Sequence, residues 1–84
     1  MTNAKRKVIG DTPEHGKHLL WDSHAQTITE INGGLAFAIG VAILEAELAR
    51  DRERFWQIQH PNGVVIYHIS YVLAGQMVVT HIGG

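Results

Sequence analysis

A long stretch of this chain without Lys, Arg, Asp or Glu contains three histidines, His60, His68 and His81, and several aromatic residues, among them Trp56 and Tyr67. Residues 55–84 contain no Lys, Arg, Asp or Glu. His68 and His81 are therefore among the few groups there whose charge changes near neutral pH. Trp56 and Tyr67 in the same stretch offer flat faces on which a ligand can stack. We predict a ligand-binding site made of Trp56, Tyr67, His68 and His81.

A second histidine cluster lies near the start of the chain. His15, His18, Asp22 and His24 offer imidazole and carboxylate groups, which suit zinc, nickel or copper. Their spacing is loose, and the first of them lies in a segment that we expect to be flexible. We therefore prefer the interpretation of an exposed histidine cluster, and we predict neither a metal site nor a cofactor.

Nucleophilic catalysis has little support in the sequence. There is no cysteine, and the serines are Ser23 and Ser70. On a strand, Ser70 would share a face with His68, but the sequence offers no third acidic group to orient the imidazole. We therefore favour binding or interaction over catalysis.

Charge patterning argues against nucleic-acid and membrane partners. The net charge is −1, and the basic run Lys5-Arg6-Lys7 is short and has no aromatic residues interleaved with it. The apolar run from Gly33 to Leu44 is shorter than the roughly 20 residues that span a bilayer. We expect a cytoplasmic protein without a nucleic-acid or membrane partner.

The elements that position these residues begin after a polar segment. Residues 1–15, with Gly10 and Pro13 as breakers, predict a flexible N-terminal arm, and residues 16–84 a single small domain. His18-Leu19-Leu20-Trp21 predicts a strand. Residues 25–31 are ambiguous, because β-branched residues favour a strand and a capping-box pattern favours a helix; we lean towards a strand or irregular structure.

The sequence predicts a helix over residues 35–53, which follows a break at Asn32-Gly33-Gly34. Two apolar stripes run along it at helical spacing: Leu35, Ile39, Ala42 and Ala46, and Phe37, Val41, Leu44 and Leu48. With two stripes, its first turns are apolar all round, so we expect them to be covered on several sides.

Three strands follow the helix, over residues 55–60, 64–73 and 77–82, with turns at Pro61-Asn62-Gly63 and Ala74-Gly75-Gln76. One register places Trp56, His68 and His81 in a single row, while a slip of one residue moves His81 to the other face. The sequence leaves that choice open.

These elements predict an α+β fold in which one main helix packs on an antiparallel sheet of three to four strands. The long uncharged stretch lacks the charges that usually protect the edge of a sheet. Eighty-four residues also provide little cover for a helix that is apolar all round. We therefore expect a homo-oligomer.

One family resemblance is visible. Gly16-Lys17-His18-Leu19-Leu20 resembles the opening strand of prokaryotic S-adenosylmethionine decarboxylases. A helix, a strand, the turn Pro61-Asn62-Gly63 and a strand ending in Val72-Leu73-Ala74 follow in the order of that family. The family continues there with Glu-Ser-His and, five residues after the serine, a second histidine. This chain has Gly75-Gln76-Met77 and then, at the matching spacing, His81.

The resemblance covers roughly residues 16–82, but the chain departs from the family at the residue that makes the catalytic group, so we expect no pyruvoyl-dependent decarboxylation. The family's serine cleaves the chain to form a pyruvoyl group, which Gln76 cannot do. The chain also has a fainter likeness to small ribonuclease toxins. We rank it lower because the catalytic basic residues of those toxins are missing from the strands here.

We therefore expect a small homo-oligomeric binding module, with S-adenosylmethionine or a related nucleoside held at subunit interfaces by Trp56, Tyr67, His68 and His81. Its aromatic rings would stack on the adenine. One alternative is a protein-interaction module, an inhibitor, regulator or accessory protein, that uses the uncharged sheet. The second is an enzyme without a pyruvoyl group that acts on an S-adenosylmethionine-type substrate.

Overall fold

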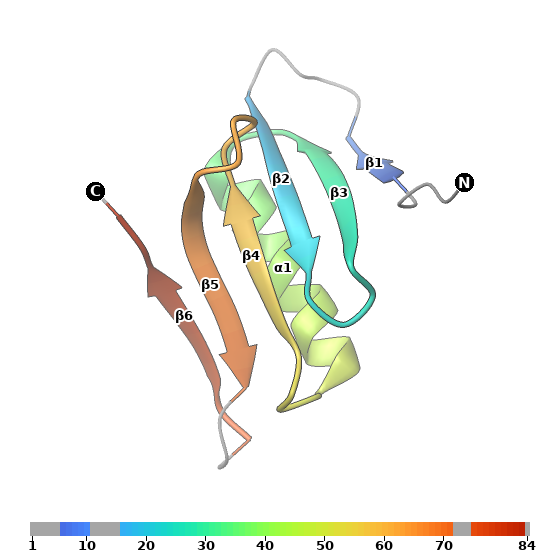
Figure 1. Cartoon of the computed structure of the whole chain (residues 1–84), viewed down its shortest axis with the longest axis vertical. Helices are drawn as coiled ribbons and strands as arrows, with labels where there is room; N and C mark the ends of the chain where they lie inside the picture. The colour runs from blue at the N-terminus through green and yellow to red at the C-terminus, as the bar shows by residue number, and fades with distance from the viewer. Residues whose placement is uncertain (1–5, 11–15, 72–74, 84) are drawn as a thin grey trace.

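The computed structural model describes residues 6–10, 16–71 and 75–83, and its elements form one helix and six strands. The strands are β1 (Arg6–Ile9), β2 (Lys17–Asp22), β3 (Thr27–Asn32), β4 (Phe55–Gln59), β5 (Val65–Tyr71) and β6 (Met77–His81), and the helix is α1 (Leu35–Ala49). Figure 1 shows all strands side by side in one sheet with α1 against one face. The predicted α+β class, with one helix packed on a sheet, is confirmed.

The sheet has more strands than predicted, and it is mixed. Its order is β1-β3-β2-β4-β5-β6, with β1 parallel to β3 and every other pair antiparallel. The prediction of three to four antiparallel strands was wrong because it took residues 6–9 as part of an arm and left the segment before the helix undecided. A short basic segment becomes a strand only through its pairing with β3, which no local pattern reveals.

The ambiguous segment before the helix is strand β3. The turn that leads into it closes when the Gln26 backbone N–H donates to the Asp22 carbonyl at 2.8 Å, with Gln26 in the left-handed region at φ 55°. Every residue of β3 then pairs with β2, from Asp22 opposite Thr27 to Lys17 opposite Asn32. Strand propensity and pairing outweigh the capping-box pattern.

Helix α1 begins as predicted and ends four residues earlier. Its last regular residue is Ala49, because Arg50 adopts the left-handed conformation at φ 49° and its N–H donates to the Ala46 carbonyl at 2.9 Å. A left-handed residue after the last turn is a common way to end a helix. The chain then turns back towards the sheet and enters β4.

The hairpin between β4 and β5 has the predicted turn. Gly63 adopts φ 91°, which side chains disfavour, and the Val64 N–H donates to the Asn62 side-chain oxygen at 2.9 Å. The second predicted turn falls partly on residues 72–74, which lie outside the described residues.

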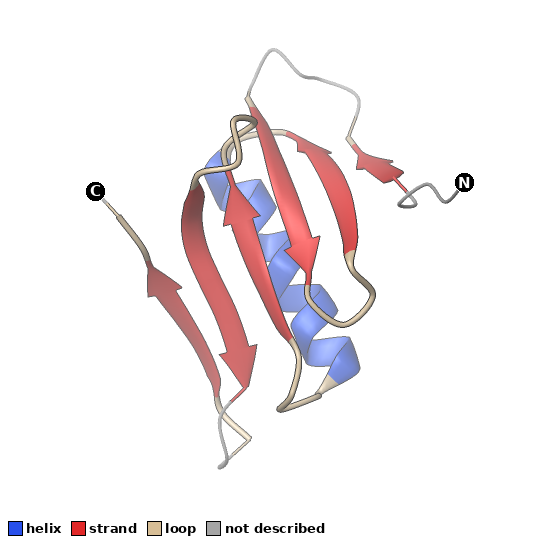
Figure 2. Ribbon diagram, viewed as in Figure 1, coloured by secondary structure: helices blue, strands red, loops and turns tan. Residues whose placement is uncertain are grey.

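Helix α1 lies against the middle of the sheet (Figure 2), and the core side chains fill the layer between them. Three fully buried alanines, Ala38, Ala42 and Ala46, face strands β2, β4 and β5. Small side chains let the helix backbone lie close to the sheet, so the strands supply most of the bulk. The largest fully buried side chains come from those strands and β3: Trp56, Leu20, Ile31, Ile58 and Ile69.

Candidate interaction surface

The four residues predicted to bind a ligand are divided between the two faces of the sheet. Trp56 pairs with the core residue Ile69, so its side chain points to the face that carries α1. Tyr67 packs against the core and pairs with His81, so both of these side chains point to that face as well. His68 pairs with Gln57 and Thr80 and points to the opposite face. The register that would join Trp56, His68 and His81 in one row is therefore not the one that forms.

Trp56 is part of the core. Its side chain is fully buried, and the Arg54 guanidinium lies 5.0 Å from its ring centroid, within the range of a cation–π contact. Its indole Nε1 has no hydrogen-bond partner among the described residues. The ring therefore offers no face to an outside ligand.

Tyr67 and His81 form a contact near the edge of the sheet. Their ring centroids lie 4.9 Å apart at an interplanar angle of 45°. Tyr67 is half-buried against the core, while His81 is exposed. Of the predicted ligand residues, these are the two that lie together.

The face without the helix, which we call the open face, is an uncharged surface over β4, β5 and β6. On the central strands it carries Leu19, Trp21, Phe55, Gln57, His68 and Ser70. Strand register lines up Trp21, Gln57, His68 and Thr80 across four strands, and the Phe55 and His68 rings stack with centroids 4.9 Å apart. Among the described residues of strands β2 to β6, the charged side chains on this face are Lys17 of β2 and Glu30 of β3, which form an ion pair at 3.6 Å.

The outer edge of β6 is a row of backbone groups that no strand of the sheet pairs. Ile82 donates its N–H to the Ile66 carbonyl at 2.7 Å. Residues of an antiparallel strand alternate between bonding to their neighbour and pointing away from it. The N–H and C=O groups of Met77, Val79 and His81 therefore face outwards.

Three apolar side chains at this edge are accessible, beside the polar and exposed Thr80 and His81. Val78, Val79 and Ile82 are 39–40% exposed, and α1 contacts β2, β4 and β5 but makes no comparable contact with β6. The opposite edge differs because its strand, β1, carries the basic and exposed residue Lys7. Charges on an edge strand discourage pairing with another chain, and β6 lacks that protection.

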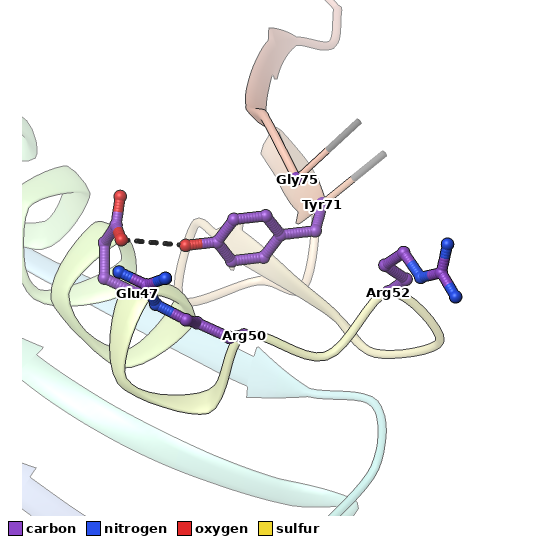
Figure 3. A pocket seen from close by; sticks show the side chains of 5 residues that line it. All are labelled: Glu47, Arg50, Arg52, Tyr71 and Gly75. Carbon is purple, nitrogen blue, oxygen red and sulfur yellow. Dashed lines mark hydrogen bonds between the residues drawn. The ribbon is translucent and has the colours of Figure 1, made fainter. Parts of the chain in front are cut away.

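A pocket of about 280 Å³ lies where the end of α1 meets the end of β5. It is lined by Glu47, Arg50, Arg52, Tyr71 and Gly75. Figure 3 shows the Tyr71 hydroxyl directed at the Glu47 carboxylate, to which it donates a hydrogen bond of 2.8 Å. Burial, and then this bond, raise the pKa of Tyr71. The Glu47 carboxylate balances one of the two guanidinium groups, so the charged side chains of the lining carry a net charge of +1. Sequence reasoning missed this site, which only the end of α1 and strand β5 bring together.

The described residues of the histidine cluster near the N-terminus do not come together at one site. The Nδ1 atom of His18 lies 3.2 Å from the Gly33 carbonyl oxygen, His24 is exposed, and Asp22 is paired with Arg54. His15 lies outside the described residues, as does Lys5 of the basic run. Among the residues that the structure describes, no group of three His, Cys, Asp or Glu side chains is arranged to hold a metal ion.

The Asp22–Arg54 pair holds the elements together rather than forming a reactive site. The Asp22 carboxylate accepts bonds from Arg54 and from the backbone N–H groups of His24 and Ala25, at 3.0 and 3.2 Å. Burial acts to raise the pKa of Asp22, but Arg54 and these amides together hold it below its ordinary value. The pair ties the β2–β3 turn to the chain that leaves α1.

A comparison with protein-family models, with curated proteins and with solved structures finds no match to this chain. Within the described residues, helix α1 does not reach the length and apolarity that a membrane-spanning helix requires.

Proposed function

We propose that this chain is a protein-interaction module that pairs the outer edge of β6 with an extended segment of another protein. The observation that carries the proposal is the accessible row of backbone groups at Met77, Val79 and His81, flanked by exposed apolar side chains. A segment added there would continue the sheet through backbone hydrogen bonds, with side chains providing selectivity.

The residues at this edge indicate what kind of segment would bind there. Strands β4, β5 and β6 carry no charged residue, so a charged segment would lose hydration without gaining an ion pair there. We therefore expect an uncharged, β-prone segment, whose side chains extend alternately over the open face and over the exposed margin beside α1.

The proposal is tested by removing one backbone donor. Proline at Val79 eliminates an outward N–H but no bond to β5, and proline is tolerated on edge strands at such positions. Val79→Thr is the matched control, since it retains the N–H and a β-branched side chain. Tagged wild-type and variant chains are used to capture partners from a lysate of the source cells, after thermal unfolding has verified that all three are folded.

We expect Val79→Pro to lose the captured partner and Val79→Thr to retain it. Hydrogen exchange on the complex should also slow at the amides of residues 77, 79 and 81. Equal capture by the proline variant, or unchanged exchange at those amides, would overturn the proposal.

A second candidate function is binding of S-adenosylmethionine or a related nucleoside, and the contact between Tyr67 and His81 favours it. Those two rings offer a stacking face and a hydrogen-bonding group at an accessible margin. The candidate is the weaker one because Trp56 is buried and His68 points to the other face. A thermal-shift titration with S-adenosylmethionine tests it: a shift that His81→Ala abolishes supports this function, and no shift removes it.

A further inference from the structure

Helix α1 has an apolar face on the side away from the sheet. Phe37, Leu44 and Leu48 are 47%, 60% and 77% exposed, and Val41 between them is half-buried where it packs against the core. The stripe of Ala38, Ala42 and Ala46 already packs on the strands. The predicted stripe of Leu35, Ile39, Ala42 and Ala46 therefore packs on the core. The other predicted stripe, Phe37, Val41, Leu44 and Leu48, remains mostly uncovered, and we call it the outer stripe. Large side chains exposed in a continuous row indicate an interaction site.

The spacing of this outer stripe is symmetric. Its positions follow at intervals of four, three and four residues, so the midpoint lies between residues 42 and 43. If a second copy of α1 lies antiparallel, Phe37 of each copy meets Leu48 of the other, and Val41 meets Leu44. A two-fold interface requires this self-complementarity, because the same patch is used on both subunits. Intervals of three and four also form the seam along which paired helices cross at a shallow angle.

Charge and size agree with the antiparallel arrangement. Residues 33–44 are uncharged, and Glu45 and Glu47 lie in the second half of the helix. An antiparallel pair places each acidic half beside the uncharged half of the other copy, whereas a parallel pair would place like charges together. Gly40 beside the stripe is exposed with open space around it, which leaves room for the second helix.

We propose that α1 is the interface of a two-fold, antiparallel dimer of this chain. The occupant of the apolar stripe is a second copy, and β6 remains free for the partner described above. A 15-residue helix is about 22 Å long. Two such helices bury less than the roughly 1,600 Å² of a standard interface. We therefore expect a dissociation constant in the micromolar range.

Sedimentation equilibrium of the full chain between about 1 and 200 µM tests the proposal across that range. We expect the wild type to be a dimer at the upper end, and Leu44→Glu to weaken dimerisation at least about 30-fold. Ala36→Glu is the matched control, because it adds the same charge at an exposed helical position outside the stripe. Circular dichroism verifies that both variants are folded, as expected for exposed sites.

Cross-linking tests the orientation. The chain has no cysteine, so an introduced pair gives an unambiguous disulfide. Mixed Phe37→Cys and Leu48→Cys chains should form a disulfide with each other, while each variant alone should not. A wild type that stays monomeric at 200 µM would overturn the proposal, as would efficient cross-linking of either variant with itself. A dimer that Val79→Pro abolishes and Leu44→Glu leaves intact would instead assign self-association to β6.

Discussion

Asp22 connects three parts of the chain through a single carboxylate. It lies at the end of β2, accepts two amide donors from the turn that follows, and pairs with Arg54 at the entrance to β4. Arg54 in turn covers the ring of Trp56. Because these contacts favour the charged form of Asp22, they make the free energy of unfolding depend on pH.

We expect stability to fall as the solution becomes acidic. The pKa of Asp22 lies below its ordinary 3.8, so the stabilisation is complete above that value and is lost as the pH falls through the folded-state pKa. Asp22→Asn should lower the free energy of unfolding at pH 7 by roughly 2–4 kcal/mol. Urea unfolding between about pH 2 and pH 7 measures both effects.

The control for this prediction is Glu53→Gln, which neutralises an exposed carboxylate in the same region. It should preserve the acid-dependent loss of stability, whereas Asp22→Asn should reduce it. The same loss in wild type and in Asp22→Asn would contradict the assignment to Asp22.

At the scale of elements, the inner face of α1 determines how closely the helix approaches the sheet. Ala38, Ala42 and Ala46 are fully buried between the helix and the strands. The bulky side chains beneath them, such as Trp56 and Ile58, come from the strands. The helix is thus positioned by small residues on one side and by large residues on the other.

We expect Ala42→Leu to lower the free energy of unfolding by about 1–3 kcal/mol, since the added atoms must displace the helix or the strands. Ala36→Leu makes the same substitution at an exposed position of the same helix and should change stability by less than about 0.5 kcal/mol. Chemical denaturation of both variants gives the comparison. Equal effects in the two would show that Ala42 is not closely packed.

At the scale of the whole molecule, one helix is too small to cover the sheet. The described chain measures 38 × 35 × 22 Å, and α1 packs over β2, β4 and β5. The open face, the β6 edge and the outer side of α1 thus remain accessible. Since α1 and β6 are different elements, exposed substitutions on each separate the dimer proposal from the strand-pairing proposal.

Elements that depend on neighbouring residues could be predicted from the sequence. Apolar spacing located α1, the Pro61-Asn62-Gly63 turn located the β4–β5 hairpin, and the two stripes of the helix anticipated an apolar surface that 84 residues leave uncovered. Local chemistry suffices for these features because each depends on residues close together along the chain.

Which side chains share a surface depends instead on contacts between strands that are distant in the sequence. The register between β5 and β6 assigns His81 to one face and His68 to the other, and pairing with β3 makes a strand of Arg6–Ile9. Trp56 lies in the core because its strand passes beneath α1. A shift of one residue between strands reverses every side chain, and the sum of distant contacts fixes that choice.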